Sequence, residues 1–153
     1  MTNEILNSNT FIAFLMKAKQ NTYAGEGALT RSSRPGSKDL TYQEGPFMYL
    51  DTYLGDIDFI GEEAVWFEGK PIWGMNYVGR MLTDKIPSGF SEFLKSTLMN
   101  VPPEMPFRGP EERTEGDFSY SCCVEGSLEW YKGTESIIYK GQKIYQLSFH
   151  GGF

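Results

Sequence analysis

The sequence predicts an α+β domain built from two tandem copies of one unit, a helix followed by three antiparallel strands. Three observations indicate this fold class. The helical phrase FxxFL occurs twice, runs of aromatic and β-branched residues cut by glycine follow each occurrence, and the two halves align with each other. We expect repeat 1 over about residues 9–80 and repeat 2 over about 88–152. The two units should pack about a pseudo-twofold axis, with two helices against antiparallel sheet in one core.

Two helices are predicted from apolar residues spaced at i, i+3, i+4 and i+7 or i+8. The first runs from residue 11 to about 20, with Asn9 or Thr10 as its N-cap. The second follows Ser88. Their apolar positions are Phe11, Phe14, Leu15 and Ala18 in the first helix, and Phe90, Phe93, Leu94 and Leu98 in the second.

The remaining chain has the composition of strands, with hairpin turns expected at Glu68-Gly69-Lys70 and Lys140-Gly141-Gln142. Polar residues with glycine, serine and proline predict two long loops, 24–44 and 101–115. Alternation along the first predicted strand places Phe47, Tyr49, Asp51 and Tyr53 on one face.

The alignment of the halves pairs Gly45 with Gly116 at an offset of 71 residues, and Glu63 with Glu135 at an offset of 72. Self-similarity at a nearly fixed period indicates an internal duplication. Glu63 and Glu135 then occupy equivalent positions, which we expect to point inward near the axis. The alternative is two unrelated meanders that share a composition rich in strand formers.

The composition is typical of a globular protein, with 40% hydrophobic and 15% aromatic residues. Its 153 residues suit one domain spanning 1–153. The formal charge of −6 comes without a basic patch, which disfavours direct binding of nucleic acid. No apolar run has the length of a signal peptide or a membrane span, so we expect a cytoplasmic chain without membrane contact.

Metal and cofactor sites are disfavoured by the residues present. The two cysteines, Cys122 and Cys123, are neighbours that would point to opposite faces of a strand, and His150 is the single histidine. We expect two reduced thiols, with one of them in the core. No phosphate loop, dinucleotide fingerprint or nucleophile elbow occurs, and we therefore expect no cofactor.

Several phrases together resemble a bacterial family of uncharacterised domains: TYAGEG, SRPGSKDL, YLDTYLG, FIGEEAVW, PIWGMNYVG, FRGP, GTESIIY and FHGG. The resemblance runs from about Phe11 to Gly152. Members of that family occur alone or at the C-terminus of transcriptional regulators that begin with an XRE-type helix-turn-helix. The resemblance therefore implies a sensor or interaction domain, with a helix-turn-helix protein as a partner.

Four charged residues recur in corresponding places and are candidates for ligand binding: Glu63, Glu135, Arg34 and Arg108. A carboxylate inside the fold must be paired or hydrogen-bonded, and an arginine fork matches carboxylate geometry. One interpretation is a site for a cationic or hydrogen-bonding ligand. The other is that each glutamate pairs with an arginine, Arg34 or Arg108, to hold a loop on the sheet.

Two further candidates are polar positions at which the halves differ. Asp51 corresponds to Cys122, and His150 corresponds to Val78. Such residues are not required by a repeated fold and could form an acid and base pair. Trp73, with the other tryptophans, is interpreted as part of the core or of a cleft wall suited to a flat apolar or cationic molecule.

The leading functional hypothesis is a non-catalytic small-molecule-binding or sensor domain related to the effector domains of transcriptional regulators. A small hydrolase or isomerase using Asp51, Glu63 and His150 is one alternative, and it requires those side chains to lie close together. A protein-interaction module, such as a homodimer, is the other.

Overall fold

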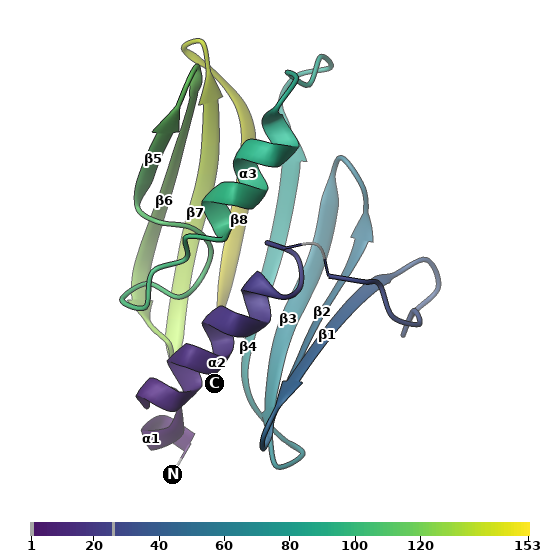
Figure 1. The fold of residues 1–153 in the computed structure, drawn as a ribbon, viewed down its shortest axis with the longest axis vertical. Coiled ribbons are helices and arrows are strands. Elements are labelled where there is room, and N and C mark those ends of the chain that lie inside the picture. Colours follow the sequence, from purple (N-terminus) through teal and green to yellow (C-terminus); the bar gives the residue numbers. More distant parts are fainter. Residues whose placement is uncertain (1, 26) are drawn as a thin grey trace.

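One eight-stranded antiparallel sheet dominates the computed structural model, which describes residues 2–25 and 27–153 (Figure 1). Its strand order is β1-β2-β3-β4-β8-β7-β6-β5. The strands are β1 (Lys38–Glu44), β2 (Phe47–Gly55), β3 (Phe59–Phe67), β4 (Lys70–Met81), β5 (Glu112–Glu115), β6 (Phe118–Ser127), β7 (Trp130–Tyr139) and β8 (Gln142–Gly152). The helices are α1 (Thr2–Leu6), α2 (Asn9–Gln20) and α3 (Phe90–Leu98).

The predicted fold class of tandem αβββ units is wrong. The structure is mainly a single sheet with a few short helices, and four strands follow α2 and α3 alike. The additional strands are β1 and β5, which lie in segments that the sequence predicted as loops. Both are edge strands, and their polar sequences KDLTYQE and ERTE lack the alternation of a half-buried strand.

The two predicted hairpin turns are confirmed. Each is a two-residue turn with positive φ at both positions, 49° and 79° at Glu68 and Gly69, and 48° and 81° at Lys140 and Gly141. Such turns match the twist of antiparallel strands and therefore fix the registers of β3 with β4 and of β7 with β8.

Both longer helices cover the same face of the sheet, hereafter the helix-side face (Figure 1). The helix predicted over residues 11–20 begins two residues earlier, and its N-cap is Ser8, whose Oγ accepts a hydrogen bond from the Phe11 amide at 3.2 Å. Helix α3 begins after Gly89, which has a φ of 87° and, having no side chain, forms no side-chain cap. The opposite face of the sheet, the outer face, carries no helix in the part of the chain that the structure describes.

The core lies between the helices and the helix-side face. Alternate residues of the central strands point into it, for example Trp73, Met75 and Tyr77 on β4, while Asn76 and Val78 face outward. The first-strand face predicted from alternation is confirmed for Phe47, Tyr49 and Asp51, which are all buried. No helix among the described residues is long and apolar enough to cross a lipid bilayer.

The two halves of the chain join through β4 and β8, which pair from Gly74↔Gly152 to Met81↔Tyr145. These strands separate β3 from β7. Glu63 on β3 and Glu135 on β7 consequently do not meet, in contrast to the expectation of a shared position at a central axis. Each glutamate instead forms its own cluster on the helix-side face.

Candidate functional site

The first buried charge cluster is centred on Lys19, from the last turn of α2. Lys19 is fully buried, and its Nζ donates to Glu63 Oε1 at 2.7 Å and to the Phe107 carbonyl at 2.6 Å. It also contacts the Tyr23 hydroxyl at 3.3 Å, and Tyr49 donates a second hydrogen bond to Glu63 Oε1. Burial lowers the pKa of Lys19, and the nearby carboxylate opposes that shift. The cluster thus ties α2 to β3 and to the segment after α3.

The second cluster is centred on Glu135, and all of its hydrogen-bonding capacity is used within the fold. Arg108 donates two hydrogen bonds, from Nε to Oε2 at 3.1 Å and from Nη2 to Oε1 at 2.9 Å. Tyr120 donates to Oε2 at 2.5 Å and Tyr145 to Oε1 at 2.8 Å. Every carboxylate oxygen thus has two donors, and Arg108 pairs with Glu135, which is the contact that the loop-holding interpretation requires.

Asp51 differs from both glutamates because it lies beside another carboxylate. It is the direct cross-strand partner of Glu63, which places the two Cβ atoms on one face at a separation of about 5 Å. Only 2% of Asp51 is exposed, and Tyr77 donates to its Oδ1 at 2.5 Å. Burial, and then the charge of Glu63, raise the pKa of Asp51 to about 7. Asp51 can therefore gain or lose a proton near neutral pH.

The corresponding position in the second half carries a thiol. Cys122 is the cross-strand partner of Glu135 and is buried, while Cys123 is exposed on the outer face, as adjacent strand positions predict. Burial raises the pKa of the Cys122 thiol to about 12, so the thiol stays protonated and neutral. The two halves thus differ at this buried position, which carries a carboxyl that titrates near neutral pH in the first half and a neutral thiol in the second.

Asp51 lines a cavity of about 710 Å³ between β2, β4, α3 and the chain that follows α2. We call it the helix-side cavity. Its wall is mainly apolar, and its deeper polar groups are Asp51, Tyr77, Arg108 and Tyr145. The apolar lining includes Leu29, Leu40, Ile57, Phe59, Ile86, Phe90, Leu94 and Leu98. An apolar cavity with a few convergent polar groups is the usual form of a small-molecule site.

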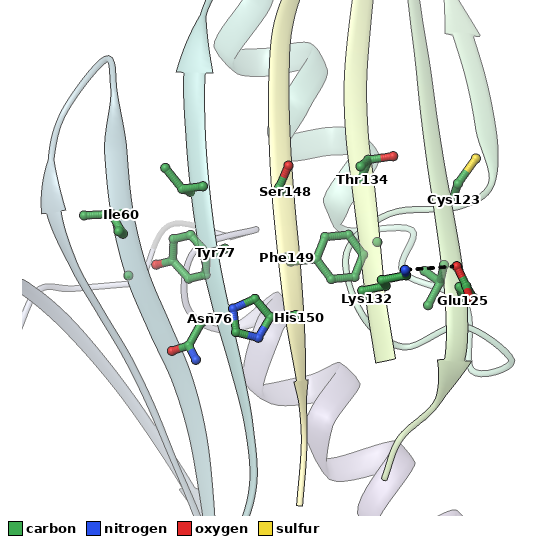
Figure 2. A pocket seen from close by; sticks show the side chains of 14 residues that line it. Ile60, Asn76, Tyr77, Cys123, Glu125, Lys132, Thr134, Ser148, Phe149 and His150 are labelled. Atoms are coloured by element: carbon green, nitrogen blue, oxygen red, sulfur yellow. Dashed lines mark ion pairs between the residues drawn. The ribbon is translucent and has the colours of Figure 1, made fainter. Parts of the chain in front are cut away.

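A second hollow of about 810 Å³ lies on the outer face, across β3, β4 and β6–β8 (Figure 2). His150 lies there beside Asn76, and Lys132 pairs with Glu125 at 3.6 Å. Both partners of that ion pair are more than 70% exposed, so solvent screens their attraction. This outer-face hollow is larger than the helix-side cavity, but its charged side chains are solvated, and we therefore place the candidate site on the helix side.

The structure brings together some of the residues that the sequence singled out and separates others. Asp51 and Glu63 are neighbours, and Arg108 lines the same cavity. His150 lies on the opposite face from Asp51, so the two cannot form an acid and base pair. Arg34 is exposed and donates to Thr52 Oγ1 at 2.6 Å, and it pairs with neither glutamate.

Trp73 belongs to the core. It stacks on Tyr131, with ring centroids 6.0 Å apart, and Lys19 Nζ lies 5.5 Å from the centre of its ring. It does not line either hollow. Of the two positions predicted for Trp73, the core and a cleft wall, the structure shows the core.

Sequence reasoning missed Lys19 and Tyr77, the direct partners of the two acidic residues. The signal for Lys19 was its spacing, since it falls four residues after Leu15 on the apolar face of the helix. The signal for Tyr77 was the alternation with Trp73 and Met75 along one strand. Among the described residues no group of three or more histidine, cysteine or acidic side chains is placed to hold a metal ion.

Comparison with known proteins places the chain in a family without assigning it an activity. Neither a curated protein nor a solved structure matches the sequence. The family model described as domain of unknown function DUF5680 matches residues 51–153, which include Asp51, Glu63, Arg108 and Glu135. The chain therefore belongs to the DUF5680 family of domains of unknown function.

Proposed function

We propose that this protein is a non-catalytic small-molecule-binding domain that takes an apolar molecule into the helix-side cavity. The observation that carries the proposal is the position of Asp51 in that cavity. A buried carboxyl with one hydrogen-bond donor, set in a mainly apolar wall, is costly for the fold alone. A bound molecule that hydrogen-bonds to Asp51 would offset that cost.

The entrance of the cavity also favours an apolar ligand. Leu29, Ile57 and Ile86 line it and are 58%, 60% and 44% exposed. Large apolar side chains gathered around an opening lose contact with water when a ligand enters. These apolar side chains supply affinity for the ligand, and Asp51 orients the ligand in the cavity.

A thermal-denaturation screen against a metabolite library tests the proposal. A ligand present at 100 times its dissociation constant stabilises the protein by about 2.7 kcal/mol. Ser91 lies on α3 at the cavity, and Ser91→Trp should fill the space and remove the shift. Glu92→Trp adds the same side chain at the next, exposed position outside the cavity and should leave the shift unchanged. Absence of any shift, or a shift that survives Ser91→Trp, contradicts the proposal.

The resemblance to regulator-associated domains supports a sensor role, in which the bound and free states differ in affinity for a helix-turn-helix partner. A ligand acts in this way only if its affinity differs between the two states. Light scattering on the protein mixed with such a partner, with and without a compound found in the screen, measures the change in affinity. The same measurement on the protein alone detects a homodimer.

A small acid–base enzyme is the second candidate, and the pKa of about 7 for Asp51 favours it. Because His150 lies on the outer face, it cannot act as the base in the enzyme that the sequence analysis considered. Mass spectrometry of a bound compound recovered after long incubation separates the two functions. A sensor returns the compound unchanged, and an enzyme that depends on Asp51 returns a product that Asp51→Asn does not form.

A further inference from the structure

The helix-side cavity has one negative charge more than the fold itself compensates. Two carboxyls, Asp51 and Glu63, lie side by side, and of these two the ammonium of Lys19 pairs with Glu63. The other buried cation, Arg108, is held by Glu135 through two hydrogen bonds. One carboxyl of the pair is therefore left without a counter-charge.

The hydrogen bonds show the same imbalance. Glu63 Oε2 is buried without a hydrogen-bond partner among the described residues. Asp51 Oδ1 accepts from Tyr77, and no described donor reaches Asp51 Oδ2. In Glu135, by contrast, each carboxylate oxygen accepts two hydrogen bonds. Of the two carboxyls with unused acceptors, only Asp51 lines the cavity.

The remaining charged groups that face this pair do not supply the missing charge. Lys38 pairs with the exposed Asp56 at 3.4 Å, and Lys95 is exposed on α3 at the entrance. Tyr77 and Tyr23 stay neutral because burial raises the pKa of both phenols. In the absence of a ligand, a proton on Asp51 balances the charge of the pair.

Resting on the proposed function, we infer that the ligand of this cavity is an apolar molecule with a protonated nitrogen, an ammonium or amidinium, that pairs with Asp51. The nitrogen replaces the proton of Asp51, which leaves to solvent, so the total charge of the site is the same before and after binding. Aromatic rings in the lining favour a cation further through their faces. They belong to Tyr23, Tyr53, Phe59, Tyr77, Phe90 and Tyr145.

Three probes of one shape test the charge of the ligand: naphthylmethylamine, which is cationic, naphthylmethanol, which is neutral, and naphthoate, which is anionic. Isothermal titration calorimetry on the wild-type protein should give a dissociation constant for the amine at least about tenfold lower than for the alcohol at about pH 8. Naphthoate should bind most weakly. Amine affinity should rise about tenfold from about pH 6 to about pH 8, as Asp51 loses its proton.

Proton release gives a second measurement that needs no variant. Near pH 7 the amine should displace about half a proton per site, read from the dependence of the binding heat on the ionisation enthalpy of the buffer. In Asp51→Asn the preference of the amine over the alcohol should disappear. In Ser91→Trp all probe binding should disappear, and in Glu92→Trp it should persist.

The inference is overturned if the alcohol or naphthoate binds as tightly as the amine, if amine binding releases no proton, or if the amine does not bind at millimolar concentration. Each of these results leaves the proposed function standing, provided that some compound still gives a thermal shift that Ser91→Trp removes. If no compound does, the proposed function itself fails.

Discussion

At the scale of single residues, the two buried glutamates differ in how far their charge is compensated, and this difference predicts their roles. Glu135 holds Arg108 through a bidentate pair in which the arginine side chain is 6% exposed. Glu135→Gln would leave the buried guanidinium without its counter-charge and should lower the free energy of unfolding by about 3 to 5 kcal/mol. Urea denaturation measures this loss.

Glu115→Gln is the matched control for that substitution. Glu115 also pairs with an arginine, Arg113, but its side chain is 64% exposed. Its loss should change stability by less than about 1 kcal/mol, because solvent already screens the pair. Equal effects of the two substitutions would show that Glu135 is not the structural residue described above.

The titration of Asp51 predicts how stability depends on pH. Its pKa in the folded protein, about 7, lies above the ordinary value of 3.8, so folding favours the protonated carboxyl. The contribution to stability is therefore complete at low pH and is lost as the pH rises through about 7. Asp51→Asn does not titrate, and its stability relative to wild type should rise between about pH 4 and pH 8, by on the order of 4 kcal/mol.

Asp39 provides a control because its pKa shifts in the opposite direction to that of Asp51. Burial alone would raise its pKa, but hydrogen bonds from Ser33, Ser37 and Thr52 lower it. Its contribution is present at neutral pH and lost on acidification, so Asp39→Asn should be most destabilising near pH 7. Thermal melts of both variants across the pH range should show slopes of opposite sign. Parallel slopes would contradict the assignment for Asp51.

At the scale of elements, a glycine on β3 makes room for the tyrosine that contacts Asp51. A Cβ at Gly61 would lie 2.6 Å from the Tyr77 hydroxyl oxygen and 2.5 Å from the Thr52 carbonyl oxygen. Gly61→Ala should therefore displace Tyr77 and lower stability by about 1 to 3 kcal/mol. It should also weaken any ligand shift that depends on Asp51.

Gly74→Ala is the comparison on the neighbouring strand β4. The nearest atom to a Cβ there is the Glu63 carbonyl oxygen at 3.4 Å, and the local geometry requires no displacement of Tyr77. Differential scanning calorimetry should show a clearly smaller loss for Gly74→Ala than for Gly61→Ala. The reverse order would mean that Gly61 is not the residue that accommodates Tyr77.

The elements also show what the sequence could predict. Helix faces and hairpin turns depend on neighbours in the chain, and the pattern around Phe11 and the turn at Glu68-Gly69 predicted them. The edge strands β1 and β5 escaped prediction because a strand paired on one side needs little apolar sequence. Asp51 was identified because its counterpart is Cys122, but the pairing of Glu63 with Lys19 was not, since a lysine near a helix end is usually solvated.

At the scale of the whole molecule, the two halves are joined by one pair of central strands and by side chains on the helix-side face. The register of β4 with β8 runs over eight residue pairs, from Gly74 to Met81. On the helix side, Lys19 of the first half donates to the carbonyl of Phe107 in the second, and Arg108 lies 5.0 Å from the centre of the Tyr23 ring. Loss of either half would expose the buried charges of the other.

These contacts predict that the chain unfolds as one cooperative unit. Central strands paired on both sides, β4 and β8, should have the slowest amide hydrogen exchange, and the four-residue edge strand β5 the fastest of the strands. Peptides from β2–β3 and from β6–β7 should lose protection at the same urea concentration, because neither half retains a compensated core when β4 and β8 separate. Hydrogen-exchange mass spectrometry across a urea series measures both. Two separate transitions would mean that each half is stable without the other, and a ligand bound over β2 and β4 would then stabilise the first half alone.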